Sequence, residues 1–261
     1  MILVTNDDGI QSRGIKTLYS AALQVFGKGN VEVVAPSGPQ SASGMSLTFH
    51  KPLRITRVKA PGIEGFAVSG TPADCVFAAE FQLFKGKKVD LVLSGMNEGS
   101  NVSVQSVESS GTVSAVKFGA VRKIKGMAFS LAIEMGIGKS TYAYARTHIV
   151  RILSSIKRNG FPEGADLVNV NFPGDVRPAT KWRICGMEDV MFDDYVEERK
   201  DLAKKSYYWF GGKPKRRFSR GSDCAVIFEE HAVAITPIRL DYVSEALKKS
   251  ALERLPGASM A

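Results

Sequence analysis

The chain of 261 residues has 44% hydrophobic and 23% charged side chains, a composition typical of a globular protein with a sizeable core, which excludes a disordered chain. Its three cysteines form no CxxC pair, so a disulfide framework and a structural zinc site are disfavoured and a reducing, cytosolic setting is expected. The formal net charge of +9 raises the question of nucleic-acid binding.

The first 36 residues predict the βαβ unit of a parallel sheet. The apolar run 1–4 predicts a buried strand that ends in the polar residues 5–9. Apolar positions then recur at helical spacing from Ile15 to Phe26, and glycine follows. A second apolar run, 31–34, predicts the next strand.

Later segments continue this alternation. They predict, in chain order, a polar loop at 37–50, β-structure at 51–69, a helix at 72–84, a strand at 89–93, a second polar loop at 96–111, a helix at 112–121, a strand at 126–132, a helix at 142–156 and a strand at 167–172. We therefore expect an α/β core over residues 1–178, a Rossmann-like three-layer sandwich with a mostly parallel sheet.

Residues 179–261 are expected to extend the same overall domain. The segment 181–220 lacks a helical period and contains the aromatic run 207–210, so it predicts β-arms or hairpins that project from the core. A late strand at 233–238 and a terminal helix at 243–255 follow. We expect this extension to serve oligomerisation.

Charged side chains cluster in and beside the predicted arms, where residues 188–220 carry a net charge of +2 and the rest of the chain carries +7. Residues 188–198 carry six acidic and no basic side chains, and residues 199–220 carry nine basic and one acidic. The opposite ends of this charge dipole can pair within a subunit or between subunits. Basic residues interleaved with aromatic ones are also typical of nucleic-acid binding, which is the alternative function, although a solvated arm is favoured over it.

No targeting or membrane segment is expected. The N-terminal apolar run is four residues long and is soon followed by two acids, unlike a secretory signal. No stretch approaches the roughly 18–20 apolar residues of a membrane helix. We expect a cytoplasmic protein with no membrane partner.

Three polar segments, 5–10, 37–50 and 94–114, follow predicted strands. Because ligands of open parallel sheets bind beyond the carboxyl ends of the strands, these segments are expected to meet in space. Asp7 and Asp8 are adjacent carboxylates that both ionise readily only beside a cation or strong donors, and oxygen ligands suit Mg²⁺, Mn²⁺ or Ca²⁺. The alternative is that one of them caps the following helix.

The other two segments offer neutral oxygen ligands and hydrogen-bond donors. Ser41, Ser43 and Ser46 lie in a glycine-containing loop, and Asn97 can supply an amide oxygen to a metal. The segment 109–112 precedes a predicted helix, where free amides form either an anion cradle or an ordinary serine-capped helix start.

A receiver-type signalling domain also carries an acidic pair after its first strand. It needs a phosphoacceptor aspartate at the end of its third strand. This chain has Ser94 and Gly95 at that end, with Asp90 at the strand's start. The receiver class is therefore disfavoured.

Six motifs together resemble the SurE (stationary-phase survival protein E) family. They are NDDGI at 6–10, the SASGMS loop at 41–46, SGTPADC at 69–75, SGMNEGSN at 94–101, SGTVSA at 110–115 and AITPI at 234–238. The resemblance runs in the same order over nearly the whole chain. It implies a metal-dependent 5′-nucleotidase that hydrolyses nucleoside 5′-monophosphates to nucleoside and phosphate, with 3′-nucleotides and short polyphosphate as candidate side substrates.

By motif position, the resemblance also implies site residues and assembly. One Mg²⁺ or Mn²⁺ per subunit is implied, with Ca²⁺ able to occupy the site, and the implied ligands are Asp7, Asp8, Ser41 and Asn97. The implied phosphate or substrate contacts are Asn97, Asn101, Ser110, Gly111 and Thr112. Asp7 and Asp8 are the candidate catalytic residues, because one of them can assist proton removal from the attacking water. Arm exchange between subunits implies a homodimer or homotetramer.

The chain departs from the family's usual pattern in three places. Ser109 stands where an aromatic residue or histidine is usual, Phe118 where glutamate is usual, and Glu230-His231 where Gly-Tyr is common. None of these positions is an implied metal ligand. The departures therefore bear on substrate preference and local packing.

Overall fold

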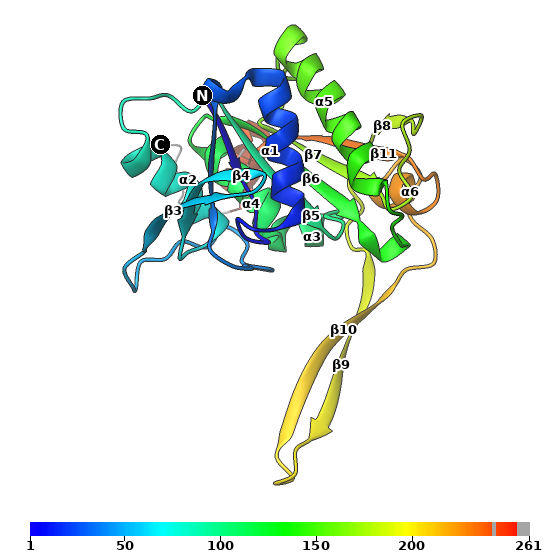
Figure 1. The fold of residues 1–261 in the computed structure, drawn as a ribbon. Helices are drawn as coiled ribbons and strands as arrows, with labels where there is room; N and C mark the ends of the chain where they lie inside the picture. The colour runs from blue at the N-terminus through cyan, green and yellow to red at the C-terminus, as the bar shows by residue number, and fades with distance from the viewer. Residues whose placement is uncertain (242–243, 255–261) are drawn as a thin grey trace.

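A computed structural model describes residues 1–241 and 244–254 of the chain. Its centre is a nine-stranded sheet in the order β3-β4-β2-β1-β5-β6-β7-β11-β8 (Figure 1). The strands from β4 to β7 run parallel to their neighbours, whereas β3 is antiparallel to β4 and β11 is antiparallel to β7. The strands are β1 (Ile2–Thr5), β2 (Val31–Pro36), β3 (Ile55–Ala60), β4 (Ile63–Val68), β5 (Leu91–Glu98), β6 (Lys125–Ala132), β7 (Leu167–Pro173), β8 (Trp182–Ile184) and β11 (Val233–Ile238).

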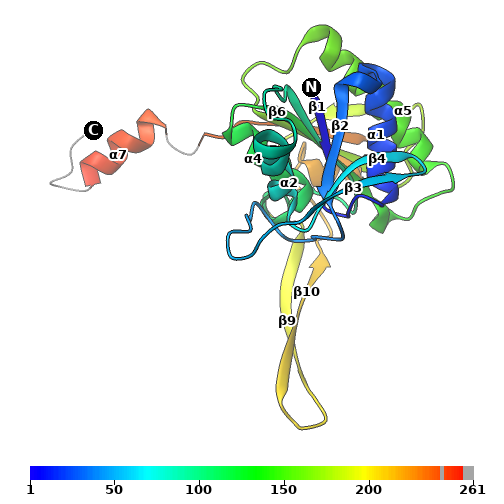
Figure 2. The same cartoon turned by 60° about the vertical axis from the view of Figure 1, so that its left-hand side comes forward.

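Helices cover both faces of the sheet, with α1 and α5 on one face and α2 and α4 on the other (Figure 2). They are α1 (Arg13–Phe26), α2 (Pro72–Ala78), α4 (Gly111–Val121) and α5 (Thr141–Asn159). In β1, Ile2 and Val4 join the core under α1 and α5, and Leu3 joins the core under α2 and α4, because successive strand residues point to opposite faces. The predicted three-layer α/β sandwich is confirmed. Among the described residues, no helix has the length and apolar character needed to span a bilayer.

Several elements differ in extent from the prediction. The strand predicted to end at residue 93 continues as β5 to Glu98, so the polar segment 94–97 lies in the sheet. The predicted loop 96–111 contains a short helix, α3 (Val104–Ser109), and a second short helix, α6 (Asp223–Phe228), was not predicted. Both are six residues long, too short for apolar periodicity to reveal them. Short helical turns also occur at η1 (Lys28–Asn30), η2 (Ala79–Leu83) and η3 (Ile133–Met135).

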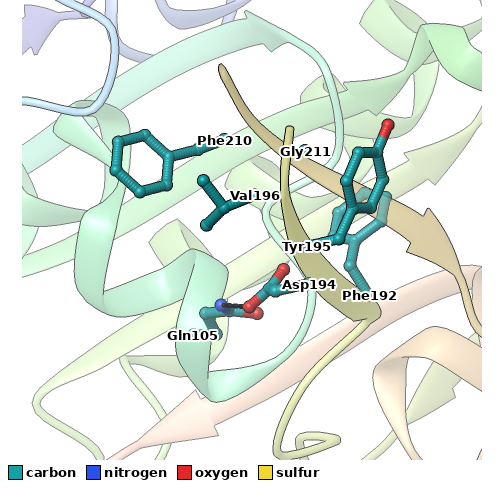
Figure 3. A pocket seen from close by; sticks show the side chains of 8 residues that line it. Gln105, Phe192, Asp194, Tyr195, Val196, Phe210 and Gly211 are labelled. Atoms are coloured by element: carbon teal, nitrogen blue, oxygen red, sulfur yellow. Dashed lines mark hydrogen bonds between the residues drawn. The ribbon is translucent and has the colours of Figure 1, made fainter. Parts of the chain in front are cut away.

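The predicted arm is a long antiparallel hairpin that projects from the body of the protein (Figures 1 and 2). It consists of β9 (Phe192–Lys200) and β10 (Ser206–Pro214), which form a sheet of their own. At its root, the Gln105 side-chain amide of α3 donates to an Asp194 carboxylate oxygen over 2.8 Å (Figure 3). This contact holds the root of the arm against the helix that precedes α4.

Within the hairpin, the acidic residues of β9 lie opposite different kinds of residue, with Asp193 opposite Lys213 at the root. Glu197 lies opposite Trp209 and Glu198 lies opposite Tyr208. Arg199 pairs with Glu197 on its own strand, with 2.8 Å between nitrogen and oxygen. The basic residues divide between the tip of the arm and its root, because the aromatic run 207–210 separates them.

The predicted extension contributes two strands, β8 and β11, to the same sheet as the core. Helix α7 (Glu245–Arg254) lies within the terminal helix predicted at 243–255. Residues 243 and 255 of that prediction lie outside the described residues.

His148 connects α5 to the edge strand β8. The indole N–H of Trp182 donates to His148 Nδ1 over 2.9 Å, and His148 Nε2 lies 2.7 Å from the Arg177 carbonyl oxygen. Since Nδ1 accepts, the ring proton resides on Nε2 and the ring is neutral. Burial lowers the pKa of His148 and favours this neutral form.

Asp223 anchors the root of the arm to the start of α3. Its buried carboxylate accepts N–H bonds from Ser103 and Glu188 at 2.8 and 2.9 Å, and from Cys224 at 2.8 Å. We expect Asp223→Ala to lower the free energy of unfolding by about 3 kcal/mol, because it leaves buried N–H groups unpaired. Urea denaturation measures this loss. Asp201→Ala, at the exposed tip of the hairpin, is the control and should cost less than about 1 kcal/mol. Equal losses in both variants would contradict the anchoring role.

Candidate active site

The structure brings the three polar segments together at the carboxyl ends of β1 and β5. The Gln40 backbone N–H donates to the Asp7 carbonyl over 2.7 Å, which joins the serine loop to the acidic pair. The Glu98 backbone N–H donates to an Asp8 carboxylate oxygen over 3.3 Å, which joins the end of β5 to the same pair. Segments distant in the sequence therefore surround Asp7 and Asp8.

The turn after β1 positions the acidic pair without using it as a helix cap. Ser12 is the N-cap of α1, and its hydroxyl accepts from the Ile15 N–H over 3.3 Å. The buried Asn6 amide donates to the Gly9 carbonyl at 3.0 Å and to the Ser12 hydroxyl at 2.9 Å. The alternative that Asp7 or Asp8 caps this helix is thus wrong, because Asn6 and Ser12 close the turn and leave both carboxylates for other contacts.

Gly9 allows the close approach of the serine loop at this turn. Its φ of +95° lies in the region that favours glycine, and an added Cβ would lie 3.1 Å from the Gly38 Cα. A side chain at position 9 would therefore strain the backbone and push the loop away from Asp7.

The two carboxylates have different environments. Asp7 is only 5% exposed, its Oδ1 accepts from the Thr112 hydroxyl, and burial raises its pKa. Asp8 is half-buried, and burial together with the charge of Asp7 raises its pKa to about 6, against the opposing bond from the Glu98 N–H. Such mutual destabilisation of two carboxylates is relieved by a cation.

The start of α4 lies directly against Asp7. The Ser110 hydroxyl accepts from the Val113 N–H over 3.1 Å, so this serine is the N-cap. A Cβ added to Gly111 would lie 2.8 Å from the Asp7 Cβ and 2.7 Å from the Ser43 hydroxyl. The serine cap does not exclude an anion site, because it satisfies one amide while the helix N-terminus still favours negative charge.

Two serines of the loop at 37–50 have different positions. Ser41 is exposed and directly follows Gln40, which bonds to Asp7. The Ser43 hydroxyl is buried beside Gly111 and has no hydrogen-bond partner among the described residues. The sequence assignment selected Ser41, so Ser43 is a further candidate. Its membership of the same loop was the only sequence signal for it.

Asn97, near the end of β5, and Asn101, after it, make different bonds. The Asn97 amide N–H donates to the Gly99 carbonyl over 2.8 Å. The Asn101 amide donates to the Ser130 hydroxyl over 2.8 Å, and the Asn101 carbonyl accepts from the Asn169 amide over 2.7 Å. Asn101 thus ties this loop to β6 and β7 and positions the polypeptide between Asn97 and α3.

The SGTPADC motif holds the far end of the serine loop, a role the sequence did not reveal. The buried Asp74 carboxylate accepts from the Thr48 N–H at 2.9 Å, the Thr48 hydroxyl at 2.7 Å and the Thr71 N–H at 2.9 Å. The Thr71 hydroxyl donates to the Ser46 carbonyl over 2.7 Å. These bonds fix the loop that carries Ser41 and Ser43.

The donor set fits a hard divalent cation. The described residues contain no cluster of three or more His, Cys, Asp or Glu side chains, so a soft or nitrogen-ligated metal lacks ligands there. Around Asp7 and Asp8 the neighbouring donors are hydroxyl, amide and backbone oxygens, including the orphaned Ser43 hydroxyl. Oxygen-only sets of this kind suit Mg²⁺, Mn²⁺ and Ca²⁺.

Residues 2–194 match the family model described as Survival protein SurE. The chain belongs to the SurE family. Two similar proteins named 5′-nucleotidase SurE come from Picrophilus torridus, 40% identical over 238 residues (91% of this chain and 90% of the relative), and Thermofilum pendens, 40% identical over 261 residues (94% of each). The crystal structure of the SurE protein from Aquifex aeolicus matches with a TM-score of 0.80 at 32% identity, covering 95% of this chain and 97% of that chain.

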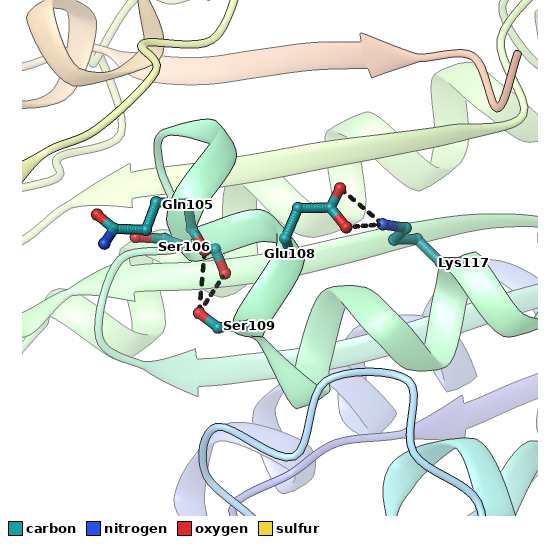
Figure 4. Close-up of polar contacts among 5 residues, drawn as sticks. All are labelled: Gln105, Ser106, Glu108, Ser109 and Lys117. Carbon is teal, nitrogen blue, oxygen red and sulfur yellow. Dashed lines mark hydrogen bonds and ion pairs between the residues drawn. The ribbon is translucent and has the colours of Figure 1, made fainter. Parts of the chain in front are cut away.

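The departures from the usual SurE pattern make their contacts with residues other than the carboxylate pair. The Ser109 hydroxyl donates to the Gln105 carbonyl over 3.1 Å, and the neighbouring Glu108 forms a two-oxygen ion pair with the buried Lys117 at 2.7 Å (Figure 4). Phe118 packs 6.3 Å from Phe77, centroid to centroid. The remaining pair makes surface contacts, Glu230 with Arg183 and His231 with Asp175.

Proposed function

We propose that this SurE-family chain is a 5′-nucleotidase that hydrolyses nucleoside 5′-monophosphates to nucleoside and phosphate. The observation that carries the proposal is the contact between Asp7 and the start of α4, which puts a carboxylate pair beside a helix N-terminus. Relatives at 40% identity over most of their length are named 5′-nucleotidase SurE, which supports the same activity.

The metal ligands in this proposal are Asp7, Asp8, Ser41 and Asn97, with Mg²⁺ or Mn²⁺ as the ion and Ca²⁺ as another ion of the same oxygen preference. A bound divalent cation would supply Lewis-acid stabilisation of the phosphoryl charge. Ser43, buried and close to Gly111, is a second serine that could contribute an oxygen.

Side chains and backbone amides of the chain bind the phosphate and accept the proton in this proposal. The phosphoryl oxygens lie at the start of α4, where Ser110, Gly111 and Thr112 present backbone amides and the helix dipole favours an anion. Asn97 and Asn101 complete the substrate contacts. Asp8, whose pKa is raised to about 6, accepts the proton of the attacking water. The Thr112 hydroxyl holds Asp7 in place through its bond to Oδ1.

The proposal includes assembly through the extension. In this proposal, residues 1–178 form the catalytic core. Residues 179–261 mediate a homodimer or homotetramer through the arm. Tyr208, Trp209 and Phe210 on the arm are 56%, 58% and 86% exposed, and exposed large apolar side chains gathered on one segment are typical of a protein interface. The proposed compartment is the cytoplasm. Sedimentation of the purified chain measures the assembly.

A panel of mononucleotides assayed with and without EDTA tests the function. We expect phosphate release from 5′-monophosphates in Mg²⁺ or Mn²⁺, reduced at least about 100-fold by EDTA and restored by excess metal. 3′-Nucleotides and short polyphosphate are included as side substrates. Phosphate release that is indifferent to EDTA would refute the metal role. Nucleic-acid binding that collapses at high salt, without phosphatase activity, would favour the alternative function.

A further inference from the structure

A cavity at the root of the arm has no part in the chemistry described above. Its volume is about 550 Å³, within the range of small-ligand sites. It lies between the loop after β5, α3, η3, the root of the arm and α6. The residues that line it include Ser100, Glu134, Phe192, Lys215, Phe218 and Phe228.

Two residues that line this cavity are hydrogen-bonded to residues of the proposed site. Gly99 lines it, and the Gly99 carbonyl accepts from the Asn97 amide over 2.8 Å. Ser106 also lines it, and the Ser106 carbonyl accepts from the N–H of Ser110, the N-cap of α4, over 2.9 Å. The wall of the cavity is therefore bonded both to Asn97 and to the N-cap of α4, which places it next to the proposed phosphate site.

One wall of the cavity is apolar and aromatic. Phe218 and Phe228 lie with their ring centroids 5.7 Å apart, and both are half-buried, so each keeps some ring surface accessible. Met191 and Phe192, at the root of β9, continue this wall. Aromatic side chains of this kind stack on nucleobases, whose flat faces are all suitable partners.

The other wall is polar and charged. The Ser100 hydroxyl and backbone N–H both donate to Glu134 Oε1, so the other carboxylate oxygen can accept from sugar hydroxyls. Lys215 and Arg216 border the cavity from the root of the arm, and Glu134 and Glu229 in the same lining balance their charge. The aromatic wall and the carboxylate acceptor match the base and the ribose of a nucleoside, which carry no charge.

We propose that this cavity binds the nucleoside part of the substrate, with the base against Phe218 and Phe228 and the ribose at Ser100 and Glu134. The inference rests on the proposed function, because it takes the phosphate site as the other end of the ligand. It makes the root of the arm a wall of the substrate site. The residues 191–192 and 214–216 thus contribute to specificity as well as to the hairpin.

The conservative variant Phe218→Leu tests the base contact, because leucine keeps the wall apolar and removes the ring. Phe77→Leu, at a half-exposed phenylalanine on α2, is the matched control. The readout is the ratio of kcat/KM for AMP to kcat/KM for glycerol 2-phosphate, which has no base. We expect the ratio to fall about tenfold in Phe218→Leu, as loss of one stacking contact predicts, and to stay unchanged in Phe77→Leu.

Binding of adenosine, which has no phosphate, separates this inference from the proposed function. Calorimetry on the wild type and both variants should show weaker adenosine binding only for Phe218→Leu, whether or not the wild type releases phosphate. An inactive wild type that binds adenosine in this Phe218-dependent way would overturn the nucleotidase function and support the subsite. An unchanged activity ratio in an active enzyme, or adenosine binding that is absent or insensitive to Phe218→Leu, would overturn the subsite.

Discussion

Asp8→Asn should reduce metal-dependent phosphate release from AMP about 1000-fold or more. The substitution keeps the size of the side chain and removes a charge that both the cation and the proton of the attacking water require. Asp90→Asn is the control, because Asp90 precedes β5 at the opposite edge of the sheet, and it should keep near-normal turnover. Near-normal turnover in Asp8→Asn would overturn the metal and catalytic role of this residue.

The same variant should make the metal-free protein more stable at neutral pH. The pKa of Asp8 is about 6 in the folded protein, whereas the ordinary pKa of an aspartate side chain is 3.8. Ionisation of this carboxylate therefore lowers the free energy of unfolding. The loss is complete above about pH 6 and is absent below pH 3.8, where Asp8 is protonated in both the folded and the unfolded chain. In EDTA, Asp8→Asn should melt above the wild type at pH 7.5, and the difference should shrink as the pH falls to 4. Added Mn²⁺ should stabilise only the wild type.

Gly111→Ala should reduce kcat/KM about 100-fold. An added Cβ would lie 2.7 Å from the Ser43 hydroxyl and 2.8 Å from the Asp7 Cβ, distances at which one of the groups must move. Displacement of a site group by a fraction of an ångström to one ångström is enough for an effect of this size. Steady-state assays with AMP measure it.

The helix itself would tolerate alanine at position 111. Alanine is the better helix former by roughly 1 kcal/mol, so a loss of activity there must come from the contact with Asp7 and Ser43. Gly29→Ala is the matched control, because an added Cβ at that position meets no atom within 4 Å. Wild-type kcat/KM in Gly111→Ala would show that the approach of α4 to Asp7 is unimportant for the reaction.

Local sequence patterns predicted most of the fold because apolar periodicity reports which face of each element is buried. The segments 1–4 and 31–34 are continuous apolar runs, and they form the adjacent parallel strands β1 and β2. The pattern failed for β5 beyond residue 93, where Ser94 is fully buried despite being polar. Neighbouring strands and loops bury that segment, and their contacts produce no apolar periodicity in its own sequence.

The charge dipole is an intermediate case. Its position beside the aromatic run predicted projecting arms, and the structure has the hairpin of β9 and β10 there. Which acidic residue lies opposite which basic residue was not predictable from the sequence, because the strand register determines the cross-strand pairs. In that register Glu197 and Glu198 lie opposite aromatic residues, whereas Asp193 lies opposite the basic Lys213.

The sequence by itself determined the family, the α/β class and the identity of the acidic pair, because these depend on motifs and on the order of short segments. Only the tertiary structure decided that Ser12 caps α1, that Ser43 is buried beside Gly111, and that a cavity borders the site at the root of the arm. Those features join residues far apart along the chain. The distances between these residues depend on how the whole sheet packs against its helices, and no local sequence pattern encodes that packing.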